Sequence, residues 1–425
     1  MSCPFSTGAS RRGFFRTAAG GVLAAVTGTA LATATDAQPS EPFHGPHQGG
    51  IATPQQKHVY FVALDLTAKR REEVVAMLRA WTAAAARLAR GLPAGPISAD
   101  VNAMAADGGD TIGLSPARLT LTFGFGARLF EKDGRDRYGL AARRPAALVD
   151  LPVFHGDQLD PVRCGGDLCI QACADDPQVA FHAVRELVRI AYGRADLRWA
   201  QTGFLPDTPT GETARNLMGF KDGTNNSAPG KPPRADVPRR FEDVVWVGDE
   251  GPDWLRGGSY LMARRIRISL EHWDRSEVDF QEEVIGRHKY SGAPIGAADE
   301  FAPLGLDRAD AEGNPVIKDT AHVRLAAAAV NDGAMILRRA YSYNDGANFT
   351  ALRWPPWRQG MMYDAGLFFL AWQRDPRTGF IQIFENMAKM DALNQFTTHN
   401  GSALFACPGG VAEGEFIGQN LFAST

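Results

Sequence analysis

Apolar and polar positions along the first half of the chain follow the periods of strands and helices. Residues 58–66 (HVYFVALDL) are rich in β-branched and aromatic side chains, which is typical of a buried strand. Residues 67–90 then place Val74, Leu78 and Trp81 at helical spacing. The same patterns predict a strand over 119–125, a strand over 167–174, a helix over 179–192 and a strand over 197–204. This order of strand, helix, strand, strand, helix, strand predicts a ferredoxin-like arrangement.

A similar order recurs in the second half of the chain. The patterns there predict strands over 258–270, 335–343, 366–372 and 403–406, with helices over 278–287 and 376–390. Two such halves can face each other sheet to sheet, so we predict an α+β fold. Two long loops, 205–257 and 288–321, interrupt the pattern, and loops of such length in a compact domain usually either carry a site or are disordered.

Composition narrows the class of protein. The chain has 425 residues, of which 44% are hydrophobic and 22% charged, enough for a sizeable core. The net charge of −3 argues against nucleic-acid binding through a basic surface. No uninterrupted apolar stretch reaches the roughly 20 residues that a membrane span needs. The five cysteines include no C-x-x-C and no C-x-x-C-H, which excludes a zinc ribbon and covalent c-type haem attachment.

The first 37 residues contain the three parts of an export signal. Arg11 and Arg12 precede a mildly apolar stretch over 18–32, and small-x-small sites follow between Ala30 and Ala37. Paired arginines at this place favour the twin-arginine route. We therefore predict that residues 1–37 are a twin-arginine signal peptide and that the mature protein resides in the periplasm.

The densest polar cluster covers residues 215–226 (RNLMGFKDGTNN). In it, Gly219 and Gly223 bracket the lone carboxylate of Asp222, and glycines let a flat ligand approach the backbone closely. The alternative interpretation is an ordinary Asp-Gly turn. The glycines match neither a G-x-G-x-x-G fingerprint nor a P-loop, so nucleotide binding gains little support.

Two further positions have an unusual context. His322 follows a loop and precedes the run Val323–Leu325, which makes it a candidate ligand. Arg338 lies beside Arg339 in a predicted strand, where an arginine must pair with an anion, reach solvent or destabilise the fold. The sequence contains no G-x-S-x-G elbow and no H-E-x-x-H motif. The histidines without an identifiable functional partner are His44, His47, His155, His182, His272, His288 and His399.

Five stretches taken together closely resemble the dye-decolourising peroxidases, specifically their exported EfeB-type (deferrochelatase/peroxidase) branch. These stretches are residues 45–56, 215–226, 285–296, 321–325 and 336–343, and they span nearly all of the mature chain. The resemblance implies a dimeric α+β barrel of two ferredoxin-like halves with antiparallel sheets, holding one non-covalent haem b per chain. It divides the chain into the signal peptide 1–37, an N-terminal arm 38–57, an N-terminal half 58–215 and a haem-binding C-terminal half 216–425.

The resemblance also assigns residues. By position, Asp222 corresponds to the distal aspartate of the family's G-x-x-D-G motif, Arg338 to the distal arginine and His322 to the proximal iron ligand. The residues placed around the haem are Gly223, Thr224, Asn225, Arg287 (near a propionate) and Asp391 (behind the proximal histidine). Where this branch often has Asn-Pro-Arg, the chain has the alanines 327–329, so we assign no haem contact to them.

The function implied by the resemblance is that of a haem peroxidase, which uses hydrogen peroxide to oxidise organic, dye-like substrates by one-electron steps. An ionised Asp222 can move the peroxide proton, and Arg338 can donate to the departing oxygen. Because a neighbouring arginine lowers the pKa of a carboxyl group, we expect an activity optimum on the acid side of neutral.

Two alternative functions stay open at this point. The first is a deferrochelatase that takes haem as its substrate and releases iron with the porphyrin intact. The second is a non-catalytic haem carrier, which would keep His322 but has no need of Asp222 and Arg338 together. The expected small-molecule partners are hydrogen peroxide with an organic reductant, or haem. A homodimer and iron-uptake partners are left open.

Overall fold

The computed structural model describes residues 40–423, apart from residue 231 and the segments 234–236 and 353–357. The predicted signal peptide, residues 1–37, lies outside the described residues. None of the described helices is both long enough and apolar enough to cross a membrane.

The N-terminal half has the predicted order of strands and helices. Its elements are β1 (His58–Leu66), α1 (Arg71–Leu88), β2 (Thr120–Gly126), β3 (Leu168–Ala174), α3 (Pro177–Ile190) and β4 (Ala195–Phe204). The strands pair antiparallel in the order β2-β3-β1-β4. Two residues fix the start of α3. The Asp176 side chain accepts hydrogen bonds from the backbone N–H groups of Gln178 and Val179, and Pro177 occupies the first helical position, where no N–H is needed.

The C-terminal half repeats this order with longer connections. Its main elements are β5 (Ser259–Ile268), α6 (Val278–Ile285), β7 (Tyr341–Leu352), β8 (Arg358–Gln373), α8 (Phe380–Met390) and β9 (Thr397–Cys407). The shorter elements of the chain are α2 (Ala127–Phe130), α4 (Phe241–Val245), α5 (Leu270–Trp273), α7 (His322–Leu325), β6 (Leu337–Arg338) and α9 (Gln419–Phe422). The strand order β9-β5-β8-β7 is that of the N-terminal half, again antiparallel.

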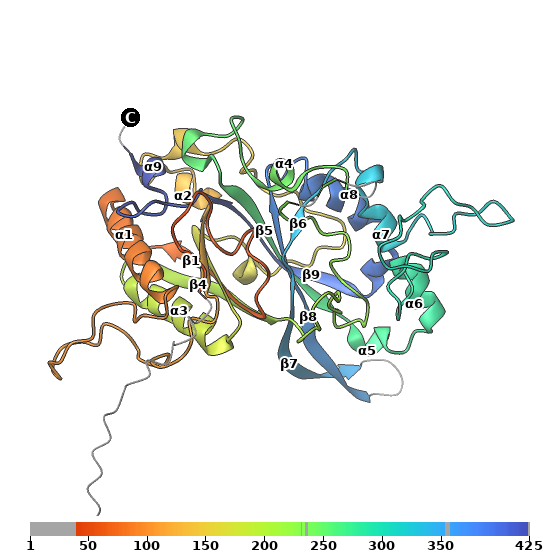
Figure 1. Ribbon diagram of the computed structural model, residues 1–425, viewed down its shortest axis with the longest axis horizontal. Helices are drawn as coiled ribbons and strands as arrows, with labels where there is room; N and C mark the ends of the chain where they lie inside the picture. The colour runs from red at the N-terminus through yellow and green to blue at the C-terminus, as the bar shows by residue number, and fades with distance from the viewer. Residues whose placement is uncertain (1–39, 231, 234–236, 353–357, 424–425) are drawn as a thin grey trace, which may run out of the picture. The chain divides into compact units, whose positions relative to one another are not determined.

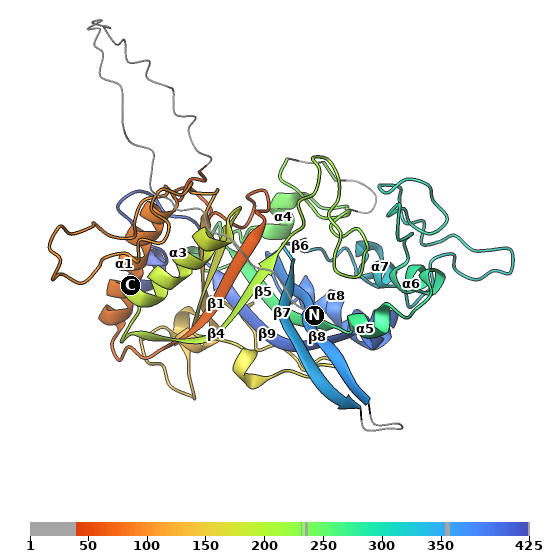
Figure 2. The same ribbon diagram turned by 90° about the horizontal axis from the view of Figure 1, so that it is seen from below.

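The two sheets join into one closed barrel. The pairings β2–β9 and β4–β7 connect the halves edge to edge, and β5–β8 completes the ring of eight strands. Helices α1 and α3 cover the N-terminal half, whereas α6, α7 and α8 lie together beside the C-terminal half (Figures 1 and 2). The α+β barrel expected from the sequence is therefore the observed fold.

Alternation along each strand separates two apolar cores. On β1, Val59, Phe61 and Ala63 face the barrel interior, where they pack with residues of both halves. The neighbouring positions Val62 and Leu64 instead join the core beneath the helices. This period of two is the one expected of a strand that is buried on both faces.

One predicted strand is wrong in detail. The pattern over 335–343 predicts a continuous strand, but the structure divides it into β6 and β7, and the two residues between them, Arg339 and Ala340, form hydrogen bonds with the N-terminal arm. The Arg339 guanidinium donates to the carbonyl of Thr53 at 2.5 Å and to the side chain of Gln56, and Gln55 donates to the carbonyl of Ala340 at 2.8 Å. Oxygen atoms of the arm thus accept hydrogen bonds from the buried guanidinium of Arg339.

Candidate functional site

A cavity of about 290 Å³ lies in the C-terminal half, between the strands β5, β8 and β9 and the helices α7 and α8. Aliphatic and aromatic side chains form much of its wall, among them Ile266, Ile268, Ile285, Leu304, Phe369, Ile383 and Met387. All eight residues named from the sequence line it: Asp222, Gly223, Thr224, Asn225, Arg287, His322, Arg338 and Asp391. Such an apolar cavity with a few convergent polar groups is typical of a cofactor site.

Asp222 is presented by a tight loop in the connection between the two halves. The Asn216 side chain closes this loop by accepting from the backbone of Met218 at 3.0 Å, while the Asp222 N–H donates to the carbonyl of Ala214 at 2.8 Å. Gly219 and Gly223 have φ values of +86° and +112°. Because other residues adopt such angles only with strain, both glycines are required for the loop that aims the carboxylate.

Arg338 forms an ion pair with Asp222, although the two residues lie far apart in the sequence. Its Nη1 donates to Asp222 Oδ1 at 2.6 Å, across 116 positions of the chain. Asn226 fixes the backbone at this point, since its amide donates to the Arg338 carbonyl at 2.6 Å and accepts from the Arg338 N–H at 3.0 Å. Asn226 thereby ties the loop that carries Asp222 to the strand that carries Arg338.

Electrostatics keeps Asp222 ionised. Burial raises the pKa of this carboxyl group, but the charge and the hydrogen bond of Arg338 outweigh burial, and the net pKa lies below its usual value. The side chains of Arg338 and Asp222 are 31% and 22% exposed, so a small molecule in the cavity can reach both. A carboxylate and a guanidinium held together in this way can accept and donate protons or hydrogen bonds at one point.

His322 is the first residue of α7 and is oriented by Asp391. Its Nδ1–H donates to Asp391 Oδ2 at 2.7 Å. The other carboxylate oxygen of Asp391 accepts from the backbone N–H of Leu393 at 2.8 Å, so the carboxylate is held at both ends. Burial lowers the pKa of His322, but the charge of Asp391 and its hydrogen bond outweigh burial and raise the net pKa. With Nδ1 engaged, Nε2 is the nitrogen available to a ligand in the cavity.

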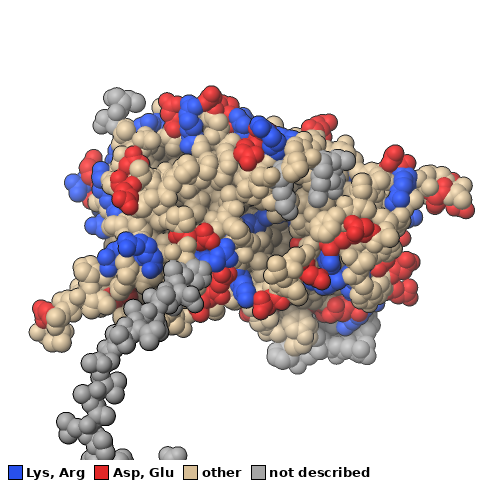
Figure 3. Space-filling model, in the orientation of Figure 1, with Lys and Arg blue, Asp and Glu red and all other residues tan. Residues whose placement is uncertain are grey.

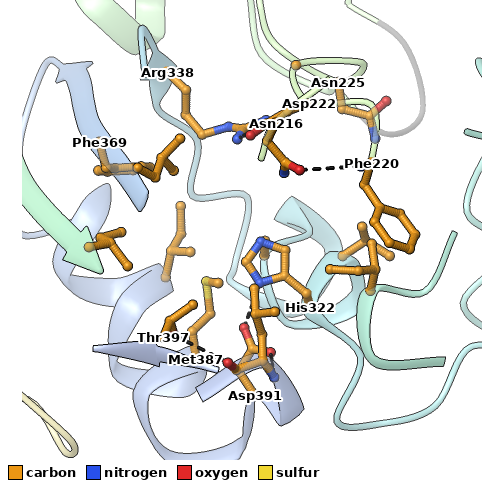
Figure 4. A pocket seen from close by; sticks show the side chains of 18 of the residues that line it. Asn216, Phe220, Asp222, Asn225, His322, Arg338, Phe369, Met387, Asp391 and Thr397 are labelled. Atoms are coloured by element: carbon orange, nitrogen blue, oxygen red, sulfur yellow. Dashed lines mark hydrogen bonds and ion pairs between the residues drawn. The ribbon is translucent and has the colours of Figure 1, made fainter. Parts of the chain in front are cut away.

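The two pairs face each other across the cavity. In Figure 4 the His322 ring stands below Asp222 and Arg338 with one ring nitrogen turned upwards, and Asp391 lies below the ring. The charges of Asp222 and Arg338 also act on the pKa of His322. The arrangement therefore offers one imidazole nitrogen on one side of the cavity and an acid–guanidinium pair on the other.

The remaining predicted residues line the cavity with their own partners. The Thr224 hydroxyl donates to Glu300 Oε1 at 2.9 Å, and Glu300 also binds Lys221 Nζ at 2.5 Å. Arg287 is buried and donates through Nη1 to the carbonyls of Gly292 at 2.7 Å and Glu300 at 2.9 Å. Gly223 and Asn225 lie beside Asp222 in the same loop.

Sequence reasoning missed three polar contributors to this site. Asn216 and Asn226 lie inside the recognised cluster 215–226, but their role as ties depends on tertiary contacts. His399 also lines the cavity, and its Nδ1 has no hydrogen-bond partner among the described residues. Burial and the charge of Arg264 lower the pKa of His399 to about 3, so this imidazole is neutral at ordinary pH.

Comparison with known proteins decides the family. The N-terminal and C-terminal models of the Dyp-type peroxidases match residues 48–205 and 213–412. The chain belongs to the Dyp-type peroxidase family. It is 41% identical over 389 residues to a dye-decolorizing peroxidase of Thermobifida fusca, covering 88% of this chain and 83% of that protein. It is 32% identical over 391 residues to the deferrochelatase of Escherichia coli K12, covering 90% and 87%.

Solved structures agree with the sequence comparison. Ferric DtpA from Streptomyces lividans superposes with a TM-score of 0.80 at 41% identity, covering 91% of this chain and 98% of that one. As a Dyp-type peroxidase, the protein is an oxidoreductase with haem as its cofactor.

The residues of this Dyp-type peroxidase fit a haem. His322 supplies an imidazole nitrogen whose ring is held by a carboxylate, which is the arrangement that histidine ligands of metals generally have. The apolar walls suit the faces of a porphyrin, and the pair Asp222–Arg338 lies where a small ligand would meet the opposite face. Figure 3 shows that acidic and basic side chains are intermixed around a hollow on the face that is also seen in Figure 1.

Proposed function

We propose that this Dyp-type peroxidase cleaves hydrogen peroxide between Asp222 and Arg338 on one side and His322 on the other, and then oxidises organic, dye-like reductants. The observation that carries the proposal is the pair of ion-paired groups that face each other across one cavity. Over a full cycle, one hydrogen peroxide, two protons and two electrons from the reductant give two molecules of water.

Asp222 is the proposed proton carrier. Because its pKa is depressed, the carboxylate is ionised and can accept the proton of one peroxide oxygen. It can return this proton to the second oxygen, which then departs as water rather than as hydroxide. Asn216 contributes by holding the loop in the conformation that aims the carboxylate into the cavity.

Arg338 is the proposed electrostatic partner. Its guanidinium donates hydrogen bonds to the oxygen on which negative charge develops. Asn226 fixes the arginine backbone on both its N–H and its carbonyl, so the guanidinium starts from a defined position.

His322 is the proposed ligand of a non-covalent haem b, one per chain. Asp391 holds the proton on Nδ1 and makes Nε2 more electron-rich. A bound haem would supply the redox chemistry that couples the two-electron reduction of peroxide to one-electron oxidations of the reductant. Arg287 is the basic residue proposed to lie near a propionate.

A second candidate function is iron release from haem with the porphyrin intact. The observation in its favour is the 32% identity to the Escherichia coli deferrochelatase, and the same cavity would hold haem as substrate. Release of iron requires two protons to replace it on the porphyrin, and Asp222 lies in the cavity to deliver a proton. In that case the protein would work with iron-uptake partners.

Product analysis separates the two functions. The purified holoprotein is mixed with a dye in the presence and absence of hydrogen peroxide, and a second sample is incubated with excess haem and analysed for metal-free protoporphyrin. We expect peroxide-dependent dye oxidation that is fastest at acid pH. Metal-free protoporphyrin without any peroxide-dependent dye oxidation would favour iron release instead.

We further propose export to the periplasm by the twin-arginine route. The support is the paired arginines Arg11 and Arg12 before an apolar stretch and a small-residue cleavage zone. Replacement of both arginines by lysine is expected to leave the haem-loaded precursor inside the cell, whereas the parent is recovered from the periplasmic fraction. Equal periplasmic recovery of both proteins would contradict this route.

A further inference from the structure

A second cluster of polar side chains lies in the N-terminal half and takes no part in the haem cavity. Asp107, His182 and Glu186 each present one ligand atom, and these atoms lie within 4.8 Å of one another. His182 and Glu186 are one helical turn apart on α3, while Asp107 comes from the loop between α1 and β2. The exposed fractions of His182, Glu186 and Asp107 are 1%, 0% and 9%. We propose that these three residues bind a structural divalent cation, with zinc as the best match.

The hydrogen bonding of His182 points to a ligand. Nδ1 lies 2.7 Å from Asp110 Oδ1, and since a carboxylate only accepts, the proton of a neutral imidazole is on Nδ1. The Nε2 lone pair then faces Asp107 Oδ2 at 3.3 Å, and Nε2 makes no hydrogen bond with any residue that the structure describes. Two electron-rich atoms at this separation repel each other unless a positive charge lies between them.

The geometry suits a metal ion. Two ligand atoms that are each roughly 2.0–2.1 Å from a tetrahedral zinc lie about 3.3 Å apart, which is the separation of His182 Nε2 and Asp107 Oδ2. The pair formed by Asp110 and His182 is the carboxylate–histidine arrangement that usually stands behind a metal-bound imidazole. Three protein ligands leave the fourth position to water.

Backbone donors hold the carboxylates in place before any ion binds. Asp107 Oδ1 accepts from the N–H of Gly109 at 2.7 Å and its Oδ2 from that of Ala94 at 2.6 Å. Glu186 Oε1 accepts from the N–H of Gly108 at 3.0 Å. The loop between α1 and β2 is thereby folded around its own acidic residues, and a cation would fasten this loop to α3.

The net charge of the cluster is compatible with a bound cation, and the types of ligand atom indicate which cation it would be. The three carboxylates of Asp107, Asp110 and Glu186 are opposed by two guanidinium groups, Arg185 at 3.3 Å from Asp110 and Arg189 against Glu186, which leaves one net negative charge. An imidazole nitrogen with carboxylates suits zinc and similar transition ions, whereas calcium and magnesium prefer oxygen ligands alone.

Metal analysis of the untagged, haem-loaded protein tests the proposal. After chelator treatment and dialysis, the protein is equilibrated with micromolar free zinc, bound zinc is measured by mass spectrometry, and thermal unfolding is followed by circular dichroism. We expect one zinc per chain in addition to iron, and a rise of the unfolding midpoint by about 2 °C or more. Millimolar magnesium or calcium should not reproduce the rise.

Matched variants locate the site. His182→Gln and Glu186→Gln should each weaken zinc binding at least tenfold, whereas His155→Gln, which removes an exposed histidine, should bind zinc like the parent. Glu186→Gln keeps a carbonyl oxygen for the Gly108 N–H, so this variant is expected to fold. The proposal is overturned if the parent takes up no zinc or if both cluster variants bind as the parent does. Stabilisation by acid pH alone, without zinc uptake, would show an imidazolium held between carboxylates and would equally overturn it.

Discussion

The N-terminal and C-terminal halves share one strand order, yet the space between sheet and helices is filled in one and hollow in the other. In the N-terminal half, Trp81 of α1 packs on Phe123 of β2 and donates through Nε1 to the Leu187 carbonyl of α3 at 2.7 Å. In the C-terminal half, Ile383 and Met387 of α8 instead form a wall of the cavity.

The difference arises from the connections rather than from the sheets. Asp222 lies in the connection between the halves, and Arg287, His322 and Arg338 all lie in the long segment between α6 and β7. These insertions hold charged groups at the cavity where the other half has apolar contacts. One topology can therefore form either a packed core or a cofactor site, depending on which residues its connections place beneath the helices.

The largest effect on haem binding is expected from removal of the proposed haem ligand. His322→Ala should abolish stable haem binding, a loss larger than the roughly 10–100-fold that removal of an outer-shell partner costs. Haemin titration followed by the Soret band measures the effect, with His155→Ala as the control for loss of a histidine. An undiminished Soret band in His322→Ala would refute the ligand assignment.

The next largest effect is expected on the rate of peroxide consumption in variants that still bind haem. Asp222→Asn keeps the size of the side chain but removes the base, so the rate of peroxide consumption should fall by about 10²–10⁴-fold. The Soret band should remain, and Asp196→Asn, an exposed aspartate on β4, should behave like the parent. Arg338→Leu is expected to slow the same step while retaining haem. Parent-like rates in both cavity variants would remove the proposed roles.

A substitution in the packed N-terminal half should lower stability without affecting haem binding. Trp81→Ala should lower the free energy of unfolding by about 3–5 kcal/mol, because it leaves a cavity in a filled core. Haem binding per folded molecule should stay as in the parent. Urea unfolding measures the loss, and Trp81→Phe is expected to recover part of it. A large change in haem affinity with little change in stability would argue against this division of roles.

A smaller effect is expected behind the haem ligand. Asp391→Asn removes the charge that holds the His322 ring, and haem affinity should fall by about 10–100-fold. The rate of haem transfer to an acceptor protein measures it. Asp196→Asn, which removes an exposed carboxylate on β4 outside the cavity lining, serves as the control.

The smallest expected effect is on stability against acid. Since the folded-state pKa of Asp222 lies below its unfolded value, its ionisation stabilises the fold above the unfolded pKa, and this contribution is lost as pH falls through the folded pKa. Asp222→Asn should therefore flatten the acid end of the stability profile. An unchanged profile would show that folding does not lower the pKa of the Asp222 carboxyl group.

Sequence patterns predicted the strands and helices of both halves because the period of each segment is local. The resemblance added the barrel and named residues that the structure brings to one cavity. The break between β6 and β7 was not predictable, because it depends on contacts of Arg339 with the distant arm residues Thr53 and Gln56. The partner of His182 was missed for a similar reason, since Asp107 and Asp110 lie in a loop more than 70 positions away.

The central claim is that an ionised Asp222 moves the peroxide proton opposite His322. The most direct measurement is the rate of the Soret absorbance change on rapid mixing of the holoprotein with hydrogen peroxide, recorded against pH for the parent and Asp222→Asn. The account predicts that the parent stays fast well into the acid range and slows only below the ordinary pKa of an aspartate, whereas Asp222→Asn is slow throughout. A parent rate that rises only above neutral pH, or a variant as fast as the parent, would contradict the account.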